Sequence, residues 1–154
     1  MGLLMSLYQI KQEQLDAVLR DPETLFDVAP LYRIDIDKSW DALRFLFSQI
    51  DHRLPKLISR EKEYEGFEFL EESGLYDINF VSHEEVKELV IALNTLSEEK
   101  LQKAFDRDTM NEEELYAAPF DEHSFSYLKG HFERLKAFYT QASNENNAVI
   151  TFIS

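Results

Sequence analysis

Cysteine is absent from this 154-residue chain, and glycine and proline occur only four times each. Without cysteine there is no disulfide framework, no thiolate nucleophile and no cysteine-based zinc site. The chain contains no glycine-rich phosphate-binding loop and no G-x-S-x-G sequence that could form a nucleophile elbow. A cysteine-free chain is compatible with a reducing compartment, and we expect a cytoplasmic protein.

Long apolar runs are also missing: none approaches the ~20 residues that a membrane-spanning helix requires. No basic residue precedes the first apolar stretch, so we expect no secretory signal. Met1–Ser6 fits the loose acceptor pattern for N-myristoylation, but Leu3–Ile10 also has the composition of a strand, which we favour. We therefore expect no membrane partner.

Positive charge is scarce, because 16 Lys and Arg residues face 30 Asp and Glu residues, for a net charge of −14. This balance disfavours binding to nucleic acid, which depends on clustered basic side chains. The acid is concentrated between Glu61 and Glu99, where twelve acidic residues accompany two basic ones. The simplest interpretation is a well-solvated surface. The alternative is an acidic face that meets a basic protein partner.

The sequence places the candidate acidic face in one Glu-rich stretch, where charge would supply steering and specificity. Tyr64 and Phe67 would be its anchors if they were exposed. The six glutamates of this acidic face are Glu61, Glu63, Glu65, Glu68, Glu71 and Glu72.

Apolar residues make up 44% of the chain, with twelve Phe and seven Tyr, which is sufficient for one domain over residues 1–154. Apolar runs at 3–8 and 148–153 predict strands near both ends. Helical spacing predicts helices between them, including one that Ser82 and Glu85 begin with a capping box. This order predicts an α/β protein, a three-layer α/β/α sandwich around a mixed sheet that includes the N- and C-terminal strands. For residues 51–81, hydrophobic periodicity does not decide between helix, strand and loop.

The sequence Asp35-Ile36-Asp37-Lys38-Ser39 places a D-x-D pattern after a short strand, where two carboxylates could hold Mg²⁺. The pattern is similar to the nucleophile motif of haloacid-dehalogenase-type phosphatases. However, Arg33 interrupts the strand, no later acidic pair follows a second apolar strand, and Asp37 is explained as the cap of the next helix. Trp40 begins an apolar stripe typical of core packing.

Histidine patterns give no complete metal site. His83 begins a near match to H-E-x-x-H, but Lys87 occupies the position of the second ligand. His123 and His131 are eight residues apart, and we expect exposed, titrating histidines there. We predict no cofactor and no metal.

The segment from Asp35 to Phe47, DIDKSWDALRFLF, resembles the signature of the YfbM family, small bacterial proteins of unknown function with a D-K-x-W-x-x-L run at this point. Residues 51–73 depart from the family pattern, since they are Glu-rich where many relatives have a glycine-containing stretch. The resemblance implies a single YfbM-like domain with a three-layer α/β/α fold, and it implies no reaction. Further similar stretches follow in the same order: Met1–Leu3, Gly74–Ser82 with Glu85 and Val86, Phe132–Tyr139 and Asn146–Ser154.

Two functional hypotheses remain open beside a purely structural or oligomeric role. The leading one is a non-enzymatic cytoplasmic interaction domain whose acidic face neutralises a basic partner. The alternative is a small-ligand binder or hydrolase-type enzyme with a cleft near Asp35, Asp37, Lys38 and Trp40. In that cleft Asp35 would act as base or metal ligand and Lys38 as an anion contact.

Overall fold

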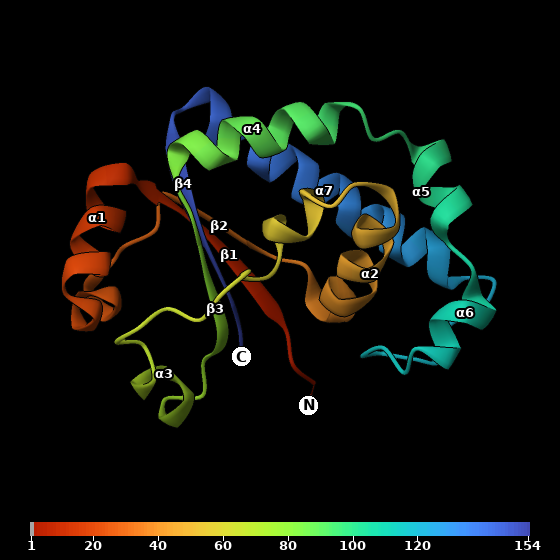
Figure 1. The fold of residues 1–154 in the computed structure, drawn as a ribbon, viewed down its shortest axis with the longest axis horizontal. Coiled ribbons are helices and arrows are strands. Elements are labelled where there is room, and N and C mark those ends of the chain that lie inside the picture. The colour runs from red at the N-terminus through yellow and green to blue at the C-terminus, as the bar shows by residue number, and fades with distance from the viewer. Residues whose placement is uncertain (1) are drawn as a thin grey trace.

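The computed structural model describes residues 2–154; Met1, the first residue of the family-like opening, lies outside the described residues. The chain forms an α/β fold around a four-stranded sheet in the order β2-β1-β4-β3 (Figure 1). The strands are β1 (Met5–Lys11), β2 (Tyr32–Asp35), β3 (Tyr76–Val81) and β4 (Asn147–Ile153). The strands predicted near the two ends of the chain pair with each other at the centre of the sheet.

The sheet is antiparallel throughout. The mixed sheet predicted from the order of strands and helices is therefore wrong. The helical excursion from β1 to β2 returns the chain at the end of the sheet where β1 finishes, and the excursion from β3 to β4 does the same. Helices between strands therefore act here as long connections between antiparallel neighbours. They do not form the crossovers that parallel pairing needs.

Helices cover both faces of the sheet and form the expected three layers (Figure 1). The larger core lies under α2 (Trp40–Ile50), α4 (His83–Asn94) and α7 (Ser124–Asn144). The smaller core, on the opposite face, lies under α1 (Gln12–Arg20) and α3 (Phe69–Glu72). The remaining elements are η1 (Pro22–Asp27), η2 (Asp37–Ser39), η3 (Leu54–Leu57), α5 (Glu98–Ala104) and α6 (Arg107–Glu112).

Alternation along the central strands explains why both faces can be filled. Met5 and Leu7 of β1 enter the larger core, whereas Ile10 enters the smaller one. Successive side chains of a strand point to opposite faces, so a strand buried on both sides must be apolar at nearly every position. The continuous apolar run at the end of the chain, which forms β4, has the same cause.

Two helix starts show where local sequence signals apply and where they do not. Ser82 and Glu85 form the predicted capping box at α4, with both hydrogen bonds at 3.2 Å. Asp37, in contrast, is not the cap of α2, because its side chain bonds no helix N–H and its backbone has φ 51°. Its carboxylate bonds Tyr127 on α7 instead. A tertiary contact therefore replaces the local cap.

Residues 51–81, which periodicity does not resolve, are held in place by three side-chain hydrogen bonds to successive carbonyls. The carbonyl oxygens of residues 56–58 accept bonds from Asn79 Nδ2 at 2.8 Å, Tyr139 Oη at 2.7 Å and Thr151 Oγ1 at 3.0 Å. All three donors have no exposed surface. Because buried carbonyls need partners, these bonds determine where the following acidic stretch leaves the core.

Replacing Tyr139 by Phe tests this anchoring. The variant leaves the Leu57 carbonyl buried without its donor, so we expect a loss of about 1–3 kcal/mol in the free energy of unfolding, measured by urea denaturation. Tyr76→Phe is the matched control, because Tyr76 is 43% exposed, and its stability should stay within about 0.5 kcal/mol of the parent. Equal stability of the two variants would contradict the anchoring role.

Candidate functional site

The acidic face lies on an irregular stretch that ends in α3, beside the edge strand β3. All six of its glutamates are exposed. Tyr64 contacts Phe80 of β3 with ring centroids 4.8 Å apart, and Leu70 is buried in the smaller core, so both ends of the stretch are attached to the sheet. The glutamates are thus displayed from a backbone that is held at two points.

A cleft of about 250 Å³ opens within this stretch, and we name it the acidic cleft. Its lining combines apolar side chains with a rim of four carboxylates. One basic residue, Arg60, is part of it. The cleft is lined by Arg60, Glu63, Tyr64, Phe67, Glu68, Leu70, Glu71, Leu75, Asp77 and Ile78.

Arg60 is already paired within the acidic cleft. Its guanidinium lies 3.6 Å from Glu63 Oε1 and 3.5 Å from Asp77 Oδ1. Asp77 has φ 56° at an irregularity in the pairing of β3 with β4, which turns this residue out of the regular ladder. Glu68 and Glu71 make no ion pair with any residue of 2–154, so the lining keeps an excess of negative charge.

The aromatic anchors expected from the sequence are not exposed. Phe67 is 5% exposed in the smaller core, and the Tyr64 hydroxyl donates to the Phe80 carbonyl at 3.2 Å. Phe26 of η1 is instead 57% exposed, and its ring meets the edge of Phe69 with centroids 5.7 Å apart. Sequence reasoning missed Phe26. The adjacent pair Leu25-Phe26 could have predicted it. Neighbouring residues of a helix point in different directions, so one of these two apolar side chains must face away from the sheet.

The D-x-D segment forms a hydrogen-bonded turn at the end of β2. Asp35 Oδ1 accepts the Asp37 N–H at 3.0 Å, and Asp37 Oδ2 accepts the Tyr127 hydroxyl at 2.6 Å. The Tyr127 bond lowers the pKa of Asp37 below its ordinary value. Burial, together with the bond to Asp37, raises the pKa of Tyr127. Asp37 is therefore engaged as an ionised acceptor.

The side chains of the other two candidate residues make different contacts, although the Lys38 N–H also bonds the Tyr127 hydroxyl, at 3.2 Å. Trp40 is 9% exposed, donates its indole N–H to the Leu3 carbonyl at 3.1 Å and stacks on Tyr116 at 5.1 Å. Lys38 is exposed and reaches toward the N-terminal residues. Asp35 lines a cavity of about 340 Å³, but Asp37, Lys38 and Trp40 are not part of its lining. This cavity is therefore lined by one of the four candidate residues, Asp35.

His131 adds a titratable group behind Asp37. Its ring lies 4.7 Å from that of Tyr127, and burial lowers its pKa below the ordinary value. Its Nδ1 has no hydrogen-bond partner within residues 2–154. In that part of the chain no three His, Cys, Asp or Glu side chains gather as a metal site would require.

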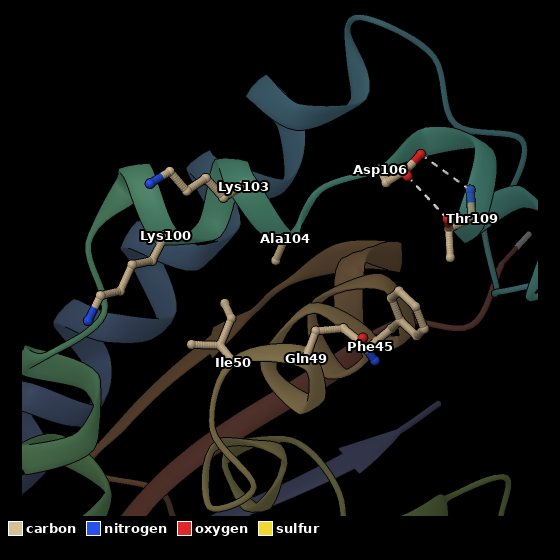
Figure 2. A pocket seen from close by; sticks show the side chains of 8 residues that line it. All are labelled: Phe45, Gln49, Ile50, Lys100, Lys103, Ala104, Asp106 and Thr109. Carbon is tan, nitrogen blue, oxygen red and sulfur yellow. Dashed lines mark hydrogen bonds between the residues drawn. The ribbon is translucent and has the colours of Figure 1, made fainter.

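A separate cavity of about 530 Å³ lies between α2 and the α5–α6 region. Figure 2 shows Lys100 and Lys103 extending along α5, away from the floor that Phe45 and Ile50 contribute. Asp106 caps α6 (Figure 2). Its carboxylate accepts hydrogen bonds from the Thr109 hydroxyl at 3.2 Å and from the Thr109 N–H at 3.4 Å. The charged groups around this cavity serve the helices and do not converge.

The comparisons with known proteins give a family and a fold. The family model described as "Domain of unknown function (DUF1877)" matches residues 1–152. A crystal structure of YfbM from Escherichia coli, a protein of unknown function, is similar, with a TM-score of 0.76 and 20% sequence identity. The similarity covers 98% of this chain and 99% of that one. A search of curated proteins finds no significant match. Among residues 2–154, no helix combines the length and apolar character needed to cross a bilayer.

Replacing Tyr127 by Phe should raise the pKa of Asp37 toward its ordinary value, because the phenol bond is the main cause of the lowering. A lowered folded-state pKa stabilises the protein above the unfolded pKa, near 3.9, and that contribution is lost as the pH falls through the folded value. We therefore expect a stability loss of roughly 1 kcal/mol or less at pH 7 that shrinks below about pH 4.

The measurements are an NMR titration of the Asp37 carboxyl and urea denaturation midpoints at pH 7 and below about pH 4. Tyr32→Phe is the control, because it removes another tyrosine–carboxylate bond, to Glu145 at 3.0 Å, and should leave the Asp37 titration unchanged. An unchanged Asp37 pKa in Tyr127→Phe would show that the bond does not hold the carboxylate.

Proposed function

This chain belongs to the DUF1877 family of domains of unknown function, and we propose that its acidic cleft binds a basic segment of a partner protein. In this proposal the chain is a non-enzymatic, cytoplasmic interaction domain. The observation that carries the proposal is the combination of an apolar cleft floor with the rim carboxylates of Glu68 and Glu71, which form no ion pair within the described part of the chain. Such a lining matches a Lys or Arg side chain, whose apolar stem and charged head need different surroundings.

Charge supports the proposal at two distances. Far from the surface, a net charge of −14 draws basic partners and raises their association rate. At contact, two opposite charges about 4 Å apart gain about 4 kcal/mol at the effective dielectric of a protein surface, before desolvation is subtracted. Since Arg60 already neutralises part of the rim, Glu68 and Glu71 are the carboxylates left to meet an incoming cation.

Phe26 supports a partner that is apolar as well as basic. It is more than half exposed, and Phe69, which its ring contacts, begins α3 within the acidic face. Covering a large exposed apolar side chain contributes up to about 2 kcal/mol to association. Exposed aromatic residues near an interface centre are also the usual hot spots. The predicted partner segment therefore places a hydrophobic residue close to its basic ones.

The alternative of a small-ligand binder near Asp35 has one supporting observation, the cavity of about 340 Å³ that Asp35 lines. The indole of Trp40 is occupied by Tyr116 and Leu3, so a ligand at Asp35 would be bound without it.

The double variant Glu68→Gln, Glu71→Gln tests the acidic cleft with a fluorescein-labelled peptide of alternating lysine and leucine as the probe. We expect at least about tenfold weaker binding in fluorescence anisotropy at low ionic strength, a change of ~1.4 kcal/mol. Raising the salt to about 0.5 M should weaken binding of the parent strongly, because these charges are near the surface.

Glu112→Gln, Glu113→Gln is the matched control, since both residues are exposed glutamates at the C-terminal end of α6 and the net charge of the two double variants is the same. The control should bind within about twofold of the parent. Equal weakening in both double variants would mean that overall charge attracts the peptide, and the acidic cleft would not be the site. Phe26→Ser should weaken binding with little change in its salt dependence.

A further inference from the structure

The cavity beside Asp35 lies at the β2 edge of the sheet, the edge opposite to the acidic cleft. Its lining is polar and includes two arginines, which is unusual on a chain with a net charge of −14. We name it the arginine cleft. It is lined by Ser6, Tyr8, Arg33, Ile34, Asp35 and Arg134.

The strand register gathers most of these side chains on one face. Ser6 of β1 lies opposite Asp35 of β2, and Tyr8 lies opposite Arg33. Opposite residues of an antiparallel pair share a face, and so do residues two apart on one strand. Arg134 comes from α7, which covers the opposite face, so the arginine cleft extends around the β2 edge of the sheet.

The arginines of this cleft are not used by the fold. Arg44, Arg53 and Arg107 each pair with a carboxylate within 4 Å, as Arg60 does in the acidic cleft. Arg33 and Arg134 have no ion-pair partner among residues 2–154. Within residues 2–154, Arg20 on α1 is the one other arginine without such a pair. In the same part of the chain, the hydroxyls of Ser6 and Tyr8 make no hydrogen bond. Four donors with unused capacity therefore line one cavity of about 340 Å³.

Among the described residues, Asp35 is the one carboxylate in this lining, and it restricts which ligands the cleft can bind. Its Oδ1 accepts the Asp37 N–H at 3.0 Å, so Oδ2 is the oxygen left to accept from a ligand. Guanidinium groups bind phosphate with two parallel hydrogen bonds, and a nearby carboxylate accepts from a hydroxyl or an amine. A cavity of this size fits a small molecule.

We propose that the arginine cleft binds a small phosphorylated molecule, with its phosphate between Arg33 and Arg134 and a hydroxyl or amino group donating to Asp35. The Ser6 and Tyr8 hydroxyls supply further donors to the phosphate oxygens. The net negative charge of the chain opposes anions in general, so selectivity comes from the two guanidiniums at short range. This site is independent of the acidic cleft and of the proposed protein partner.

Titration of the ¹⁵N-labelled protein with glycerol 3-phosphate and with inorganic phosphate tests the proposal. Both probes should produce saturable amide shifts at Ser6, Tyr8, Arg33 and Asp35, with glycerol 3-phosphate binding more tightly. The double variant Arg33→Gln, Arg134→Gln should weaken both by at least about tenfold. Its amide spectrum also shows whether the fold is kept.

Arg20→Gln is the control, because Arg20 is an exposed arginine on α1 outside the cleft, and binding should stay within about twofold of the parent. Asp35→Asn should reduce the preference for glycerol 3-phosphate over inorganic phosphate. Shifts that do not saturate, or equal losses in the control and the double variant, would overturn the site. An unchanged preference in Asp35→Asn would overturn the contact to Asp35.

Discussion

Three successive carbonyls, those of residues 56–58, accept hydrogen bonds from β3, α7 and β4, and these bonds position the acidic face. Each buried carbonyl left without a donor would cost about 1–3 kcal/mol, so the segment has one favourable position against the sheet. From that position the chain reaches Arg60 at the mouth of the acidic cleft. Tyr64 extends the same arrangement through its bond to Phe80. The exposed glutamates are therefore presented by an ordered segment, although it contains little regular structure.

The strand order places opposite chemistry at the two edges of one sheet. Carboxylates surround the edge beside β3, and the edge at β2 is lined by two arginines that form no ion pair within residues 2–154. Charged side chains at edge strands also oppose pairing with another sheet. Both arrangements follow from connectivity, because the terminal strands occupy the centre and leave the charged internal strands outside. The residues that we propose to bind ligands are thus the same ones that oppose edge-to-edge association.

Local signals in the sequence predicted much of the fold and little of the chemistry. The terminal strands, the Ser82–Glu85 capping box and burial of the Trp40 stripe were predictable, because each depends on neighbours in the chain. The antiparallel pairing was not, since helical connections permit either direction. The cap predicted at Asp37 was wrong, because a tyrosine ninety residues away bonds its carboxylate. The arginine cleft was invisible for the same reason, because Arg33 and Arg134 line one cavity only through tertiary structure.

The central physical claim is that the two sheet edges bind oppositely charged ligands independently. The most direct measurement adds the lysine–leucine peptide and glycerol 3-phosphate in succession to one ¹⁵N-labelled sample and maps the amide shifts. Two separate sets of residues should respond, one around Arg60–Ile78 with Phe26 and one around Ser6, Arg33 and Asp35. Each ligand should bind with nearly the same affinity in the presence of the other. Shifts of one shared set, or peptide shifts spread evenly over the surface, would contradict the claim.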